Sequence, residues 1–299
     1  ALKNTQGGKI QTRYVVASLP EEQAFLQVVQ LPRMRPEEVA QAVLFEAENY
    51  IPYSIDTVYI DSQIIEPFQN HLDHFDVLLA SLPRATVDAY VSVLKRAGLT
   101  LKALEIESLA ISRALIKNEA IPFPVLLIDI GAARSSFIVF SGRSLRFTTS
   151  ISVSSREFTN AIAKVLRVDA KKANELKTTY GLEDRDDPTG KQVFEALIPP
   201  LTDFIEQVKR YIAYYEPHAV HEHLPKKEAI RKVILCGGGA NLPGLPEFLT
   251  KELKMEVTKG NPWGNILPTP LKELPVLAFE ESLEYTTVLG LALRGMRSE

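Results

Sequence analysis

The sequence predicts a mixed α/β protein, because strand-like and helix-like segments alternate along its 299 residues. It is 45% hydrophobic and 24% charged, a composition that can bury the core of one large or two smaller globular domains. The sequence contains no repeat of fixed period and no low-complexity tract. We therefore expect an ordered α/β fold rather than a disordered or fibrous chain.

The first third of the chain predicts four strands and two helices. Apolar runs bounded by turn residues predict the strands, and Gly98 is expected to close the second helix. The first helix should begin at Pro36, because proline is tolerated in a first turn and the acidic Glu37 and Glu38 suit the positive end of a helix. In order, we expect strands at 14–18 and 25–29, a helix at 36–50, strands at 58–65 and 75–80, and a helix at 83–94.

The middle of the chain holds an apolar run, 125–130, which is interrupted only by Asp129. This run predicts a buried strand with a carboxylate at its end. Ser108 is expected to cap a short helix before it, and Asp169 to cap another helix after it. The other expected elements are strands at 99–106, 135–140, 145–149 and 232–236, and helices at 158–166, 201–215, 245–253 and 282–296.

Charge and cysteine content narrow the function classes. The formal charge is −3, with 34 basic and 37 acidic residues, so no excess positive field would draw the chain to nucleic acid or anionic lipid. A single cysteine, Cys236, excludes an internal disulfide framework and fits a reducing compartment. No apolar run approaches the length that spans a bilayer. These features predict a cytoplasmic protein without a nucleic-acid partner.

The segment 129–136 is the first candidate for chemistry. A tight hairpin here would present backbone N–H groups and the hydroxyls of Ser135 and Ser136 to a phosphate. Asp129, at the strand end, could hold a magnesium ion through water. The alternative is an ordinary hairpin, in which glycine and serine are common.

A run of three glycines, 237–239, follows a buried strand and precedes a helix, where a ligand could approach the backbone closely. The alternative is a flexible turn, and neither a P-loop nor a dinucleotide fingerprint matches. Cys236 is expected to be an inert thiol in the core. Two groups of histidines are expected to be solvated rather than metal-binding; they are His71 and His74, and His218, His221 and His223.

The order of these features resembles the actin, FtsA and Hsp70 superfamily, and nearly the whole chain resembles PilM proteins of type IV pilus assembly. The segments that carry the PilM resemblance are 36–52 (PEEVAQAVLFEAENYIP), 125–140, 173–182 (ANELKTTYGL), 201–215 and 236–245 (CGGGANLPGL). The resemblance implies an actin-like (ribonuclease H-like) two-domain fold with an inserted subdomain of the FtsA/PilM type. It implies the inserted subdomain, 1C-like, at 14–72, domain I at 73–122 and 275–299, and domain II at 123–274. Residues 1–13 are expected to be the remnant of a missing N-terminal segment.

The resemblance also implies a pocket for ATP and magnesium. Asp129, Gly131 and Ser135 look like the second phosphate loop, with Asp129 near the metal. Glu175 and Lys177 look like the base and ribose contacts. Gly237, Gly238 and Gly239 look like the adenosine loop. Glu107 resembles the acid that orients the attacking water in related ATPases, and the alternative is a surface acid before a helix.

Three departures from the family pattern limit the expected catalysis. The family begins with a strand and loop that carry a first phosphate-binding motif, and no such motif precedes Tyr14. Ser154 and Ser155 stand where a Gly-Gly pair usually follows the third strand, and Thr149 stands where an arginine is expected. The sequence therefore predicts at most a slow ATPase.

The resemblance implies a scaffold of the pilus inner-membrane platform that binds the cytoplasmic N-terminal tail of a PilN-like protein. Such a tail is expected to lie between the inserted subdomain and the rest of domain I. The protein would then be peripheral to the inner membrane through this partner, and self-association stays open. The alternative function is an active ATPase or a phosphotransferase of the actin and sugar-kinase superfamily.

Overall fold

A computed structural model describes residue 10 and residues 12–67, 73–183, 186–218, 229–268, 275 and 277–296. The strands are β1 (Tyr14–Leu19), β2 (Phe25–Pro32), β3 (Val58–Ile64), β4 (His74–Pro83), β5 (Thr100–Ile106), β6 (Ile121–Ile130), β7 (Ser135–Gly142), β8 (Ser144–Ile151), β9 (Lys232–Cys236) and β10 (Glu256–Lys259). The helices are α1 (Pro36–Tyr50), α2 (Arg84–Arg96), α3 (Glu107–Leu115), α4 (Ser155–Leu166), α5 (Ala170–Tyr180), α6 (Pro188–His218), α7 (Leu245–Leu253), α8 (Phe279–Ser282) and α9 (Thr286–Met296). Short 3-10 turns include η1 (Glu21–Gln23), η4 (Gly238–Asn241) and η5 (Leu283–Tyr285).

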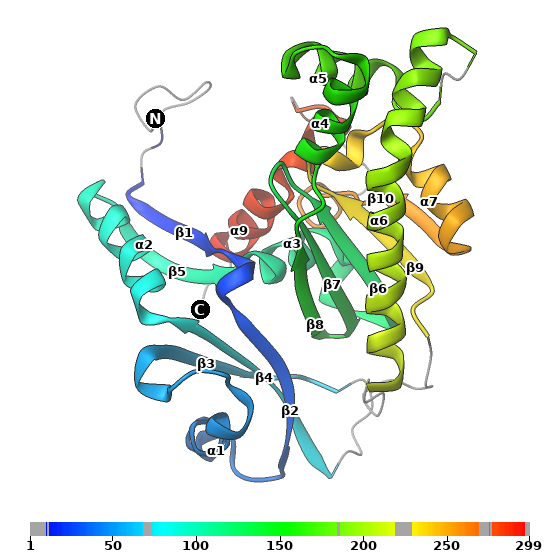
Figure 1. The fold of residues 1–299 in the computed structure, drawn as a ribbon. Helices are drawn as coiled ribbons and strands as arrows, with labels where there is room; N and C mark the ends of the chain where they lie inside the picture. The colour runs from blue at the N-terminus through cyan, green and yellow to red at the C-terminus, as the bar shows by residue number, and fades with distance from the viewer. Residues whose placement is uncertain are drawn as a thin grey trace.

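These strands form three sheets, which confirms the predicted mixed α/β class. The largest has the order β10-β9-β6-β7-β8, the second has the order β2-β4-β3, and the third pairs β1 with β5 in parallel. Figure 1 shows the five-stranded sheet beside the long helix α6, with the three-stranded sheet and α1 at the opposite end of the molecule. In this view the β1–β5 pair lies above the three-stranded sheet, next to α2 and α9.

The five-stranded sheet is buried on both faces. Leu126 and Ile128 of β6 pack into the core that helices α4 to α7 complete. Val125 and Leu127 point to the other face, where they pack against a cluster that includes Ile111 of α3. Because successive strand residues face opposite ways, burial of both faces requires a continuous apolar run, and this is the pattern of 125–130.

The three-stranded sheet packs helix α1 on one face only. Val39, Val43 and Ala47 of α1 lie on Val77 and Leu79 of β4. The strands of this sheet lie within residues 25–83, and β1 pairs with β5 in a separate sheet, so the predicted domain boundaries stay a prediction. We propose that the inserted subdomain corresponds to this sheet and its helix.

One buried ion pair joins the three-stranded sheet to the five-stranded sheet. Asp76 of β4 and Arg146 of β8 approach to 2.8 Å, and both side chains are almost fully buried. His74 lies within 3.4 Å of Asp76 and is only 14% exposed, so the expectation of a solvated histidine was wrong at this position. His71, His221 and His223 lie outside the described residues, and of His218 only the backbone, in α6, is described.

Several element boundaries differ from the sequence-based expectations. Helix α3 begins at Glu107, so Ser108 is inside its first turn and does not cap it. The backbone N–H of Ser108 instead donates to the buried carboxylate of Glu21, at 3.2 Å. Asp169 does cap α5, since its carboxylate accepts from the N–H of Lys172 at 2.8 Å. The closing segment is divided into α8, η5 and α9, and none of the described helices is long and apolar enough to cross a membrane.

Helices α3 and α9 touch at Gly290, and this contact generates a stability prediction. A Cβ atom at Gly290 would lie 1.9 Å from the carbonyl oxygen of Ala110, so Gly290→Ala must push the helices apart. We expect a loss of about 1–3 kcal/mol in the free energy of unfolding, measured by chemical denaturation. Gly295→Ala in the same helix is the control, because its Cβ would meet only ordinary contacts at 3.4 Å. Equal stability of the two variants would contradict the prediction.

Candidate functional site

The carboxyl ends of β6 and β9 bring together Asp129 and Gly237. The two strands are parallel and in register, with Asp129 opposite Cys236. Gly237 has φ +78°, and a Cβ atom there would lie 2.1 Å from Oδ1 of Asp129. A side chain at position 237 is therefore excluded by the carboxylate itself. Burial raises the pKa of Asp129 to about 6.

Glu107 lies near Asp129, and Glu21 lies near Glu107. Glu107 begins α3, and its pKa is raised to about 7, first by burial and then by the negative charges of Asp129, Glu21 and Glu22. Glu21 in η1 is 4% exposed, and burial also raises its pKa. Among the described residues, however, no group of three or more His, Cys, Asp and Glu side chains is arranged to hold a metal ion.

The hairpin between β6 and β7 uses its serine hydroxyls inside the protein. The hydroxyl of Ser135 is fully buried and donates to the carbonyl of Val153 at 2.7 Å. The hydroxyl of Ser136 is hydrogen-bonded to that of Ser150 at 3.3 Å. Gly131 donates its N–H to the carbonyl of Arg134, which closes the turn. In this arrangement the two hydroxyls are paired within the sheet and not presented to an open space.

Glu175 and Lys177 on α5 point in different directions. The ammonium group of Lys177 is buried and donates to the carbonyl and hydroxyl of Ser155, at 3.1 and 2.8 Å, and to the hydroxyl of Thr159 at 2.9 Å. Lys177 thereby fastens α5 to α4. Glu175 is exposed and pairs with Lys172 at 3.3 Å. Residues two apart on a helix lie on different faces, so these two side chains do not converge on one ligand position.

The glycine-rich loop packs between β6 and the C-terminal segment. A Cβ atom at Gly239 would lie 2.2 Å from Cγ2 of Ile130, and one at Gly238 would lie 3.2 Å from Glu284. The N–H of Gly237 donates to the carbonyl of Leu283 at 3.0 Å. Close packing of the protein on itself is thus sufficient to require glycine at 237 and 239. Of the predicted site residues, Asp129 lies directly against Gly237 of this loop.

A second site is a groove between the three-stranded sheet and the β1–β5 pair, here called the β3–β5 groove. Its volume is about 770 Å³. The unbroken runs 59–66 and 103–106 line it from opposite sides, together with residues of β4, α2, α3 and the β7–β8 hairpin. Side chains alternate across a strand, so an unbroken run indicates that the edges of β3 and β5, rather than their faces, border the groove.

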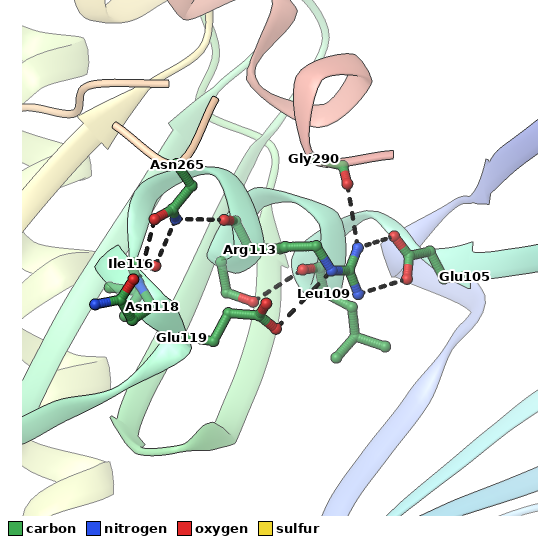
Figure 2. A network of polar contacts seen from close by, with 9 residues as sticks. Glu105, Leu109, Arg113, Ile116, Asn118, Glu119, Asn265 and Gly290 are labelled. Carbon is green, nitrogen blue, oxygen red and sulfur yellow. Dashed lines mark hydrogen bonds and ion pairs between the residues drawn. The ribbon is translucent and has the colours of Figure 1, made fainter. Parts of the chain in front are cut away.

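One end of this groove is fixed by a polar network around Arg113 (Figure 2). The guanidinium of Arg113 pairs with both carboxylate oxygens of Glu105 and donates to the carbonyl of Gly290 at 3.3 Å. The carboxylate of Glu119 lies 3.9 Å from Nε of Arg113. Asn265 adds a second tie, since its amide donates to the carbonyls of Arg113 and Ile116 at 2.8 and 2.7 Å. The PilM resemblance predicted a peptide site between the inserted subdomain and the rest of domain I. It identified none of these residues, because their contacts join distant parts of the chain.

A larger hollow of about 1320 Å³ lies along β1, here called the β1 hollow. Residues of β1, α2 and α9 line it, and several of them are exposed apolar side chains. These are Tyr14, Tyr90, Val93, Val288 and Met296. Among the described strands β1 pairs only with β5, so its other edge carries no strand.

Comparisons with known proteins place the fold and the family. A solved structure described as the PilM-PilN type IV pilus biogenesis complex is 27% identical, with a TM-score of 0.76, and the match covers 97% of this chain and 81% of that one. MreB5 of Spiroplasma citri is 15% identical with a TM-score of 0.54 over 71% of this chain and 64% of that one. The cell division protein FtsA of Streptococcus pneumoniae is 26% identical over 181 residues, which are 57% of this chain and 39% of FtsA. The chain thus spans about two fifths of the length of that relative.

Together the sheets and these likenesses define an actin-like fold, as the sequence predicted. The family model described as type IV pilus assembly protein PilM matches residues 3–296. The chain belongs to the PilM family of type IV pilus assembly proteins.

The raised pKa of Glu107 generates a prediction about pH. Its ordinary value is 4.5, so between pH 4.5 and about 7 the unfolded chain loses a proton that the folded chain keeps, and stability falls as pH rises. Glu107→Gln removes this dependence. Relative to the parent chain, the variant should gain free energy of unfolding from pH 4.5 to 7, on the order of 1 kcal/mol for a partly exposed acid, and then level off.

Denaturant unfolding at a series of pH values measures this gain. Glu175→Gln, on an exposed side chain of α5, is the matched control. A difference between the Glu107→Gln variant and the parent chain that stays constant across this range would contradict the assignment of Glu107 to a desolvated cluster.

Proposed function

We propose that the chain is a peptide-binding scaffold in type IV pilus assembly, and that the β3–β5 groove holds the cytoplasmic N-terminal tail of a PilN-like inner-membrane protein. The observation that carries this proposal is a groove bordered by two strand edges. Family membership and the likeness to a structure described as a PilM-PilN complex support it. In this proposal the protein is cytoplasmic and reaches the membrane only through its partner.

The free edge of β3 offers a backbone surface for an extended peptide. Ile65 donates its N–H to the carbonyl of Asp76 in β4, at 2.8 Å. Because backbone groups alternate sides along an antiparallel strand, the N–H and C=O groups of Ile60, Ser62 and Ile64 point away from β4. The N–H of Ser62 donates to its neighbour Asp61 at 2.9 Å, and no described strand pairs with this edge. A tail peptide would add a fourth strand here.

Part of the groove surface can bury apolar side chains of such a peptide, beside polar and charged lining residues such as Asp61, Glu66 and Arg143. Ala80 and Leu82 of β4 and Leu104 of β5 line it, and Leu109 of α3 closes its floor. Backbone pairing and apolar burial are only weakly screened by salt. Binding of the tail should therefore persist at high ionic strength, in contrast to a complex held by surface charges.

Ser62→Pro tests the use of the β3 edge. Proline removes one outward N–H and leaves the β3–β4 ladder intact, so the variant should fold normally. The tail would take the N–H of Ser62 from Asp61, so loss of this donor together with the bulk of the ring should weaken binding of the cognate tail by about tenfold. Isothermal titration at low and high salt measures this change.

Ser62→Thr keeps the backbone donor and is the control for Ser62→Pro. The proposal fails if the cognate tail gives no heat with the parent chain. Unchanged affinity of Ser62→Pro would move the tail to another surface.

A second candidate function is weak binding of ATP with magnesium at the Asp129 end of the five-stranded sheet, with at most slow hydrolysis. The close approach of Asp129 and Ile130 to the loop 237–239 favours it, and the MreB5 structure, which shares the fold, is described as bound to AMPPNP. In this proposal Asp129 holds magnesium through water and the loop 237–239 contacts the nucleoside. A strand with a first phosphate-binding motif would have its place along the free edge of β1.

The pairing of Ser135, Ser136 and Lys177 within the protein argues for low affinity, because each paired group is one fewer donor for phosphate. The proposed roles of these residues, and of Glu175 as a base contact, require side chains to turn outward when nucleotide binds. Glu107 would orient the attacking water. A kinase would need a sugar pocket beside a catalytic carboxylate, and no observation favours one.

Asp129→Ala separates binding from folding. A charge-assisted contact to the metal and its water is worth about 1.5–3 kcal/mol, so the variant should bind magnesium nucleotide about tenfold to a hundredfold more weakly. Stability without ligand should not fall at neutral pH, because burial of the charged Asp129 is unfavourable. Nucleotide titration and thermal unfolding measure the two effects. Early melting with unchanged nucleotide affinity would make Asp129 a structural acid.

A further inference from the structure

The exposed apolar side chains of the described chain fall into two main groups. One group lines the β1 hollow. The other is on the three-stranded sheet's helix α1, where Phe45 is 80% exposed and its neighbour Leu44 is 51% exposed. Tyr50, the last residue of the helix, and Tyr53 beyond it are also exposed, at 37% and 45%. An exposed phenylalanine beside an exposed leucine is typical of an interaction surface rather than of a solvated helix face.

We call the surface of Leu44, Phe45 and Glu48 the α1 face. It is separate from the β3–β5 groove. Val77 and Leu79 of β4 pack under α1, whereas Leu78, Ala80 and Leu82 of the same strand line the groove. Alternate residues of a strand point to opposite sides of the sheet, so the α1 face and the groove are on opposite sides of the three-stranded sheet. A ligand in the groove would leave the α1 face open.

The charged side chains of helix α1 itself are of one sign. Helix α1 contains four glutamates, Glu37, Glu38, Glu46 and Glu48, and no lysine or arginine. Arg35, just before the helix, pairs with Glu37 and Glu38 in the first turn. This pairing does not involve Glu46 and Glu48 in the second half of the helix. The C-terminal end of a helix carries partial negative charge, and no basic residue in the last turn offsets it. The α1 face is therefore apolar at its centre and negative at its rim.

We propose that the α1 face docks a short basic amphipathic segment of another protein. Leucine and aromatic side chains of such a segment would cover Leu44 and Phe45, and its lysines or arginines would meet Glu46, Glu48 and the helix end. A second copy of α1 fits less well, because two antiparallel α1 helices would bring acids of the same sign together. An anionic membrane surface would likewise repel these acids.

Photo-crosslinking followed by a binding assay tests the proposal. Benzoylphenylalanine in place of Phe45 in the full-length protein is activated in the host cell, and the crosslinked peptide is sequenced by mass spectrometry. We expect a segment with net positive charge and apolar residues at helical spacing. A synthetic copy of that segment should bind the purified protein, and the Phe45→Ala and Glu48→Lys variants should each bind it at least about tenfold more weakly.

Val165→Ala on α4 is the matched control, because Val165 is also exposed, at 57%, but isolated. It should leave binding of the segment unchanged, and thermal unfolding should show that both α1 variants remain folded. The proposal is overturned by the absence of an adduct, by an adduct with a second copy of this chain, with lipid or with a segment that lacks basic residues, and by equal affinity of Phe45→Ala and the parent chain.

Discussion

The buried ion pair between Arg113 and Glu105 is the interaction on which the β3–β5 groove depends. Arg113 is only 8% exposed, so its charge is tolerated because the carboxylate of Glu105 and the carbonyl of Gly290 surround it. Removing either charged partner would leave the other buried and unpaired, at a cost of about 3–5 kcal/mol. This pair holds β5, α3 and α9 in one position, and these elements form one wall of the groove and part of the wall of the β1 hollow.

The β3–β5 groove and the proposed nucleotide site at Asp129 share helix α3. Helix α3 has nine residues, with Glu107 facing Asp129 at its start and Arg113 facing the groove near its end. The C-terminal segment also connects the glycine loop to the groove. The carbonyl of Leu283 accepts from Gly237, and the carbonyl of Gly290 accepts from Arg113. Rigid packing at Gly290, where even a methyl group has no room, fixes the distance between the two sites. The fold therefore positions the β3–β5 groove and the loop 237–239 with the same short helices.

Local sequence patterns predicted most helices and strands. Side-chain directions and some helix boundaries depend on contacts between distant residues, and the sequence did not predict them. The apolar run 125–130 indicated a strand buried on both faces, and parallel strands necessarily bring Asp129 and the glycine loop to one edge. The sequence does not show which way Lys177 points, because its partners are on α4. Helix α6 continues through Pro199 and Pro200, which the apolar pattern beginning at Leu201 did not reveal. Tertiary packing of α6 against the sheet outweighs the local cost of proline.

The open edge of β3 poses a problem that the shape of the groove answers. An exposed edge invites pairing with another sheet, which leads to aggregation. At β3 the neighbouring Asp61 occupies the N–H of Ser62, and β5 and α3 stand opposite across the groove. A whole sheet cannot enter a space of about 770 Å³, but a single extended peptide can. The recess thus protects the β3 edge from sheets, and in the proposed function it leaves the edge available to the tail of an inner-membrane protein.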